Sequence, residues 1–335
     1  MNDSLAHGLQ RVLTDHCSAE EVRKLEAGGP ASLWQVVEPL GYADAFVAEE
    51  HGGIGLALDQ AFDLGFTLGR GAFPLPLLET AVARSLLAAA GIARPEGPIV
   101  LCDAQPAPAG RVALPQTPGL RHAGHVLARH ESHWYLLALA GVATGEGLRA
   151  GDYRPAVTGA VDSLPLAGAL ARFAAPHSAA VLTAPLHAAE MAGSMTAVLD
   201  MTLAYCGDRK QFGRAIGQFQ ALQMEASLLA ELVAFATMAA RMGCAGTVAA
   251  PDELRALNAK LACCDAAERA VPIAHAIHGA IGITEEYALG VHARRLHEWR
   301  SVGAVAGTAA RQLGQALLHD SGQTLQFVRQ RLAIA

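Results

Sequence analysis

The sequence predicts a mainly helical α+β protein, with an N-terminal helical domain, a small middle β domain and a C-terminal four-helix bundle. Hydrophobic residues make up 52% of the 335 residues and aromatic residues only 5%, and this bias favours helices that pack closely through small side chains. Prolines and short apolar runs gather in the middle of the chain, and helical spacing of apolar residues returns after them. We expect the three domains to cover residues 1–93, 94–178 and 179–335.

The N-terminal domain is predicted from a helix start signal and three further helical patterns. Ser18 followed by Glu21 is typical of a capping box, and it predicts a helix over residues 20–27. A glycine-rich turn at residues 49–55 separates the later patterns. These patterns cover residues 30–40, 56–68 and 76–90.

The other two domains differ in the spacing of their apolar residues. In the middle domain, short apolar runs bounded by prolines predict strands at residues 99–101, 125–128 and 134–139. After residue 179, apolar residues at helical spacing from Met191 to Tyr205, and again from Phe219 onward, predict long helices. Pro272 is expected to end or kink a later helix.

Composition argues against several classes of function. A net charge of -6 disfavours a large basic surface for nucleic acid. We expect no signal peptide, because the first residues lack a basic region followed by an apolar run, and no membrane span. The six cysteines form no Cys-x-x-Cys pair, which predicts reduced thiols and a cytoplasmic protein. We expect no metal site; four histidines in the middle domain are interpreted as solvated or packed: His122, His125, His130 and His133.

Residues 205–220 place cationic side chains beside glycines and aromatics at a break between two helical patterns. Charge and free backbone N–H groups coincide at a helix start, which suits a phosphate-bearing cofactor. The Arg209 guanidinium could match pyrophosphate oxygens, and the Phe212 ring could pack on a planar ring system. The alternative is a solvated turn between helices, with Phe212 filling the core.

Residues 277–287 form a second glycine-containing segment about sixty residues later. Its sequence up to Thr284 is Ile-His-Gly-Ala-Ile-Gly-Ile-Thr. Glycine lets a backbone approach a ligand closely, because no side chain stands in the way. The alternative is a helix C-terminal turn capped by Gly279.

Together, the two segments resemble the acyl-CoA dehydrogenase family of flavoproteins. The first segment resembles the family's Arg-x-Gln-Phe-Gly motif, and the second resembles His-Gly-Gly-x-Gly-Phe-Thr with Ala280 at the second Gly. The resemblance implies a bound FAD, with the second segment near the adenine end of a flavin held mainly by a neighbouring subunit. The implied cofactor-binding residues are Arg209, Gln211, Phe212 and Gln220 in the first segment, and Ile277, His278, Gly279, Gly282 and Thr284 in the second.

The usual catalytic base of the family has no counterpart here. Dehydrogenation at the α,β position of a thioester needs a carboxylate to take the α-proton. Two alignments of the family's Glu place Gly303 or Ala306 at its position, and the position used by other members falls near Thr183. The catalytic residue is therefore unknown, with Glu298 and Glu190 as weak candidates.

The resemblance is strongest to short bacterial members of lipid and steroid catabolism, several of which form heteromeric (α2β2) assemblies. It implies a subunit that acts on an acyl-CoA thioester with a partner that supplies the Glu, and that passes electrons to an electron-transfer acceptor. A homo-oligomer is the alternative assembly. Two alternative functions stay open: a flavin-dependent monooxygenase of the same fold, and a non-catalytic structural subunit.

Overall fold

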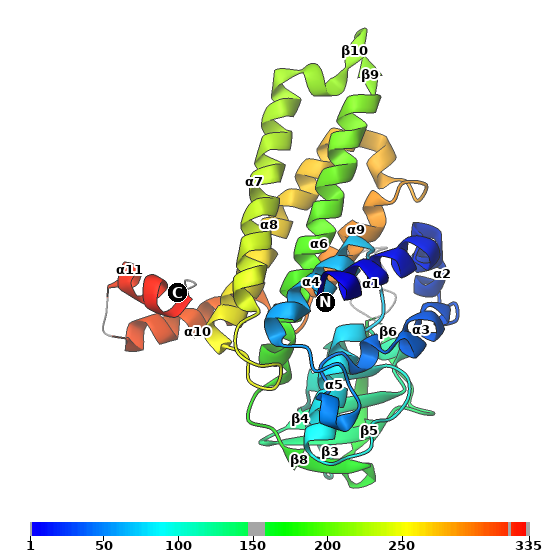
Figure 1. Cartoon of the computed structure of the whole chain (residues 1–335), viewed down its shortest axis with the longest axis vertical. Helices are drawn as coiled ribbons and strands as arrows, with labels where there is room; N and C mark the ends of the chain where they lie inside the picture. Colours follow the sequence, from blue (N-terminus) through cyan, green and yellow to red (C-terminus); the bar gives the residue numbers. More distant parts are fainter. Residues whose placement is uncertain (1, 147–157, 321–322, 333–335) are drawn as a thin grey trace.

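The computed structural model describes residues 2–146, 158–320 and 323–332 (Figure 1). Helices occupy both ends of the chain and strands occupy the middle, so the predicted fold class is confirmed. The N-terminal helices are α1 (Asn2–His16), α2 (Ala19–Glu26), α3 (Ser32–Val37), α4 (Leu58–Arg70) and α5 (Leu77–Ala89). The Ser18 side chain accepts a hydrogen bond from the Glu21 backbone N–H at 3.2 Å, so the predicted cap of α2 is confirmed.

The strands form two four-stranded sheets. The first sheet has the order β1-β4-β5-β8, in which β1 is parallel to β4 and the other pairs are antiparallel. The second has the order β2-β3-β7-β6, and all of its pairs are antiparallel. The bounds are β1 Ile99–Asp103, β2 Gln105–Ala107, β3 Arg111–Thr117, β4 His125–His130, β5 His133–Ala138, β6 Gly145–Glu146, β7 Gly159–Pro165 and β8 Ala171–Ala174.

Alternate residues of the first sheet belong to different hydrophobic cores. Val100 and Val126 face a core shared with β3 and β7 of the second sheet. Ile99, Leu127 and Trp134 face the large core that also contains the N-terminal and C-terminal helices. The three predicted strands are confirmed as β1, β4 and β5. They could be predicted because strands that are buried on both faces appear in the sequence as continuous apolar runs.

The C-terminal part is dominated by long helices that pack side by side (Figure 1). They are α6 (Ala179–Asp208), α7 (Gln220–Gly243), α8 (Glu253–His278) and α9 (Leu289–Ser301), followed by α10 (Ala306–His319) and α11 (Thr324–Phe327). The expectation that Pro272 ends the helix is wrong, since α8 continues through it to His278. Buried residues on both sides of the proline, including Val271 and Ala274, hold the helix against its neighbours although one backbone hydrogen bond is lost.

The sequence predicts no membrane span, yet α7 is long and apolar enough for one by length and composition. Only 39% of its most apolar window is buried, and large apolar side chains on its surface include Met224, Phe235 and Met238. The core helices of bundles share this length and apolar composition. In this structure α7 packs along α6 and α8.

Helices α4 and α6 approach each other through glycines. A Cβ atom at Gly193 of α6 would overlap the Phe66 carbonyl oxygen, and one at Gly69 of α4 would overlap the Glu190 carbonyl oxygen. Each glycine therefore lets the facing backbone come into contact. This contact fixes α6, which lines one of the candidate sites described below and ends beside the other.

Substitution Gly193→Ala is expected to lower the free energy of unfolding by about 2 kcal/mol, because the new methyl group overpacks a backbone contact. Gly207→Ala is the matched control, since Gly207 lies in the same helix and a Cβ there meets nothing within 4 Å. It should leave stability unchanged or raise it by about 0.5–1 kcal/mol. Urea unfolding measures both variants, and equal effects of the two would contradict this packing.

Candidate functional site

The chain between α6 and α7 folds into a short hairpin at one end of the bundle (Figure 1). Strands β9 (Lys210–Gln211) and β10 (Arg214–Ala215) pair antiparallel around a two-residue turn. Phe212 and Gly213 in that turn have φ angles of 51° and 80°, the positive values that a tight two-residue hairpin requires. The Phe212 side chain is 91% exposed, so the alternative in which it fills the core is wrong.

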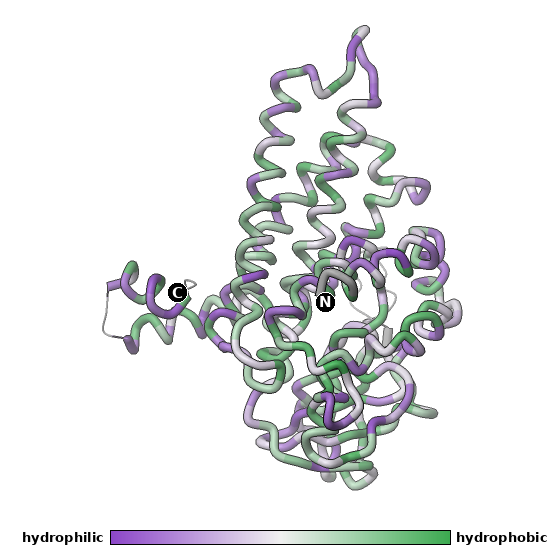
Figure 2. The backbone as a smooth tube through the Cα atoms, viewed as in Figure 1, coloured by the Kyte–Doolittle hydropathy of each residue, from purple (hydrophilic) through white to green (hydrophobic). Residues whose placement is uncertain are grey.

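Cations and polar groups surround the exposed Phe212. Arg209, Gln211 and Gln220 are exposed beside it, and hydrophilic residues mark this end of the backbone in Figure 2. The Arg214 guanidinium lies over the Phe219 ring at 4.1 Å. Within the described ranges, neither Arg209 nor Lys210 takes part in an ion pair. The hairpin thus presents positive charge and an aromatic face to the outside.

The second glycine segment lies against the C-terminal end of α6 in the same chain. The His278 ring stacks on the Tyr205 ring with centroids 4.7 Å apart, and Ile277 packs with Cys206 and Ile216. His278 Nδ1 donates to the Ala274 carbonyl oxygen at 2.8 Å, which leaves Nε2 to accept from the Tyr287 hydroxyl at 3.3 Å. Burial lowers the pKa of His278.

Residues of the second segment divide into buried and exposed groups. Ile277, His278 and Gly282 are buried, and a Cβ at Gly282 would lie 2.8 Å from the His278 Cβ. Gly279 and Thr284 are exposed, and a Cβ at Gly279 would meet nothing within 4 Å. The buried residues therefore hold the segment against α6, while the exposed ones face outward at the same end of the bundle as the hairpin.

A cavity of about 330 Å³ lies near the other end of α6, between this helix, the β region and the turn before α10. Its walls come from residues 101–103 and 115–118, from Thr183 and His187 of α6, and from residues 301–303 with Val305. Asp103 is the one carboxylate among the described lining residues, and its two oxygens accept the Ala179 and Ala180 backbone N–H groups at 3.0 Å. Asp103 thus caps the start of α6.

Two of the positions considered for the catalytic base meet in this cavity. Gly303 has a φ angle of 65°, and a Cβ there would lie 3.4 Å from Thr183 Oγ1 and 3.7 Å from His187 Nδ1. Ala306 does not line the cavity. Neither Gly303 nor Thr183 offers a carboxylate.

Glu298 and Glu190 belong to a buried cluster of charges beside the cavity and do not line it. Arg295 of α9 pairs with Glu298 and also with Glu26 of α2, where the distance is 2.8 Å. The Thr158 hydroxyl donates to Glu298 Oε1. Burial raises the pKa of Glu298 to about 7, and burial together with the Glu79 charge raises that of Glu190 well above its usual range.

The remaining members of this cluster are Glu79 of α5, His187 of α6 and Lys260 of α8, all at most 5% exposed. Donor atoms of Glu79, His187 and Glu190 lie within 4.8 Å of one another, close enough for a shared cation. The Lys260 amino group interacts electrostatically with both carboxyl groups. Lys260 also donates to the Trp299 carbonyl oxygen, and burial lowers its pKa.

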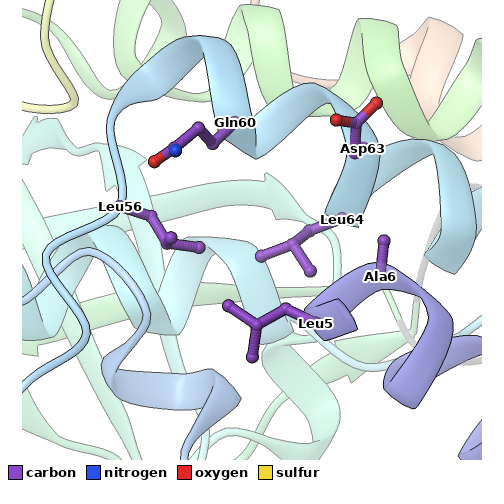
Figure 3. A pocket seen from close by; sticks show the side chains of 6 residues that line it. All are labelled: Leu5, Ala6, Leu56, Gln60, Asp63 and Leu64. Atoms are coloured by element: carbon purple, nitrogen blue, oxygen red, sulfur yellow. The ribbon is translucent and has the colours of Figure 1, made fainter. Parts of the chain in front are cut away.

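A second hollow lies between α1 and α4, lined by Leu5, Leu56, Leu64 and neighbouring residues (Figure 3). Its volume is about 10 Å³, which leaves room for little more than one water molecule. The larger cavity and the hairpin end of the bundle are therefore the two candidate sites.

Comparison with known proteins identifies the family. Residues 175–317 match the family model described as "Acyl-CoA dehydrogenase, C-terminal domain". The chain is 31% identical over 297 residues to "Acyl-CoA dehydrogenase IpdE2" of Mycolicibacterium smegmatis, which covers 85% of this chain and 89% of that protein. The chain belongs to the acyl-CoA dehydrogenase family. It is an acyl-CoA dehydrogenase-type oxidoreductase, so the predicted resemblance is confirmed.

Solved structures with low sequence identity share the fold of this acyl-CoA dehydrogenase. One is the ChsE4-ChsE5 complex from Mycobacterium tuberculosis, with a TM-score of 0.76, 18% identity and coverage of 95% of this chain and 97% of that chain. Another is the FAD complex of PigA, with a TM-score of 0.74, 15% identity and coverage of 96% and 98%.

In this acyl-CoA dehydrogenase, the raised pKa of Glu298 predicts a dependence of stability on pH. The folded protein holds a proton on Glu298 that the unfolded chain releases near its ordinary pKa of 4.5. This contribution is fully present below that value and is lost as the pH rises through about 7. Over this window it amounts to about 3 kcal/mol at most.

Glu298→Gln should remove that part of the pH dependence, which urea unfolding between pH 5 and pH 8 would measure. Glu286→Gln is the control, because Glu286 is an exposed carboxylate. If Glu298→Gln and wild type lose stability in parallel over this range, then Glu298 is not protonated in the folded protein.

Proposed function

We propose that this chain is an FAD-binding subunit of an acyl-CoA dehydrogenase that acts on a CoA thioester together with a second dehydrogenase-like subunit. The observation that carries the proposal is the exposed hairpin at the end of the bundle, with Arg209, Gln211 and Phe212 free to contact a ligand. The PigA structure of the same fold is an FAD complex. The proposed setting is the cytoplasm.

The exposed groups at this end fit the parts of FAD. An arginine fork matches pyrophosphate oxygens, and the unpaired charge of Arg209 is available for them. The exposed Phe212 ring offers a face for a planar ring, and Gln220 adds a polar side chain at the start of α7. In the second segment, Gly279 and Thr284 are placed to approach the cofactor, whereas Ile277, His278 and Gly282 support the backbone from behind.

The length of α6 argues that two subunits share each flavin. Thr183 in the cavity and Arg209 at the hairpin are separated by 26 residues along one helix, which is about 39 Å at 1.5 Å per residue. This span is longer than an extended flavin dinucleotide. The hairpin of one chain therefore serves the cavity of a neighbouring chain, and the ChsE4-ChsE5 complex offers a precedent of the same fold for an assembly of two different chains.

The cavity has a size suited to an acyl group, and the absence of a free carboxylate among its described lining residues motivates the partner. When bound, FAD supplies the hydride acceptor of the reaction. The carboxylate that takes the α-proton would come from the partner's pocket, and an electron-transfer acceptor would reoxidise the flavin. This chain would bind the thioester, exclude water and contribute the hairpin.

Arg209→Ala combined with Phe212→Ala is expected to lower the flavin content of the purified assembly at least tenfold without loss of folding, because both side chains are exposed. Absorbance at about 450 nm relative to protein measures the bound flavin. Arg311→Ala is the control, since Arg311 is an exposed arginine on α10. Equal flavin content in all three proteins would contradict the proposed site.

The chain purified alone should turn over acyl-CoA at least a hundredfold more slowly than the assembly with its partner, because the carboxylate that the partner supplies is missing. An artificial electron acceptor reports this activity. Robust turnover by the chain alone would contradict the need for a partner. Oxygen consumption driven by a flavin reductase would instead indicate a monooxygenase, and a colourless assembly would indicate a structural subunit.

A further inference from the structure

His187 lines the cavity. Among the described residues, one of its ring nitrogens has a hydrogen-bond partner and the other has none. Its Nε2 lies 2.9 Å from Glu79 Oε1, and both residues are buried. Within the part of the chain that the structure describes, Nδ1 has no hydrogen-bond partner. Leaving a buried polar atom unsatisfied costs about 1–3 kcal/mol, so an arrangement that retains one calls for an explanation.

The unpaired nitrogen is on the side of the ring that faces Gly303. A Cβ at Gly303 would lie 3.7 Å from His187 Nδ1 and 3.8 Å from His187 Cε1. Gly303 is also the position at which the family's catalytic Glu is aligned. Both Gly303 and His187 line the cavity, and with glycine at residue 303 no side chain stands against this edge of the imidazole.

The surroundings set the state of the imidazole. A neutral ring that donates through Nε2 to a carboxylate must carry its lone pair on Nδ1. Burial lowers the pKa of His187 while the hydrogen bond with Glu79 opposes this change. The other charged groups near it are Lys260 of α8 and Glu190 of α6, with Arg295 and Glu298 of α9 beyond Glu190.

We propose that His187 Nδ1 is the proton acceptor for a CoA thioester bound in this chain's own cavity, with Glu79 as its positioning residue. This inference rests on the proposed function, because it assumes that the cavity takes the thioester. The bond between the α-carbon and its hydrogen breaks, the proton goes to Nδ1, and the electron pair moves into the thioester enolate. In full dehydrogenation the hydride on the β-carbon leaves to a flavin, which is the oxidant.

The assembly would then contain two proton-transfer sites, one at His187 of this chain and one at the carboxylate of the partner. The Glu79 carboxyl group, 2.9 Å from Nε2, orients the ring and stabilises the imidazolium that forms, in the way that a carboxylate supports histidine in hydrolytic triads. Proton abstraction then needs no carboxylate at residue 303, because the imidazole lies next to that position. The cavity beside Gly303 thus contains a proton acceptor that is an imidazole instead of a carboxylate.

Acetoacetyl-CoA is a suitable probe, because its acidic C2 proton can be removed without any oxidation. The full-length chain without added FAD is mixed with acetoacetyl-CoA, and the ultraviolet band of the enolate is recorded against pH. Wild-type protein should raise the bound enolate fraction at neutral pH. His187→Gln should abolish this rise, and His292→Gln should retain it, since His292 is an equally buried histidine on α9 that bonds Ser194 instead.

The assembly loaded with flavin gives a second readout, the exchange of the α-hydrogen of a saturated acyl-CoA with deuterated water in the absence of an electron acceptor. With the partner's own carboxylate removed in all samples, His187→Gln should slow the remaining exchange about a hundredfold. Glu79→Gln should slow exchange less and move its rise with pH to lower pH, because the carboxylate that raises the pKa of His187 is gone.

The two proposals fail in different ways. The role of His187 would be overturned if enolate formation and exchange were unchanged in His187→Gln, or if His292→Gln lost them equally. Flavin binding and partner-dependent turnover would still support the proposed function. An assembly that binds no flavin, yet forms enolate only when His187 is present, would overturn the proposed function and leave the proton acceptor in place.

Discussion

Buried charges hold the helices of this protein in place around the cavity. Glu79 of α5 bonds His187 of α6, and Arg295 of α9 pairs with both Glu26 of α2 and Glu298. Removal of one partner from such a network leaves an uncompensated charge in the interior, which is strongly destabilising. The network therefore ties the N-terminal helices to the bundle, and the shape of the cavity depends on it.

The long helix α6 connects the two candidate sites and also keeps them apart. Its first turns line the cavity and are capped by Asp103, while its last turn carries Tyr205 beneath the second glycine segment. The glycine contact with α4 fixes its position in between. One rigid element thus keeps the cavity and the hairpin about 39 Å apart at 1.5 Å per residue, and the proposal of an assembly rests on this distance.

Much of this fold could be predicted from the sequence, because its strongest signals are local. The strands β1, β4 and β5 are buried on both faces and appear as apolar runs, whereas the shorter or half-exposed strands of the second sheet do not. The continuation of α8 through Pro272 depends on packing against neighbouring helices, which a local pattern does not contain. The hairpin could be located because its charges and glycines are contiguous, but the exposure of Phe212 required the structure.

The buried cluster around Glu79 and His187 could not be predicted from the sequence, because its members are far apart along the chain. Glu79 and His187 are 108 residues apart, and no spacing rule joins them. A signal was present in the helix itself, where His187 and Glu190 are titratable residues one turn apart in an otherwise apolar stretch. The resemblance to the family directs the search for a base to Gly303 and Thr183. In the structure, a Cβ at Gly303 would lie within 4 Å of both Thr183 Oγ1 and the His187 ring, a neighbour that the resemblance does not mark.

The central claim is that the hairpin of this chain grips a flavin that serves the cavity of a neighbouring chain. A crystal structure of the assembly with FAD and a CoA thioester tests it most directly. The account predicts that Arg209 and Phe212 contact a flavin whose ring system lies at another subunit's cavity. A flavin held entirely by one chain, with the hairpin free in solvent, would contradict it.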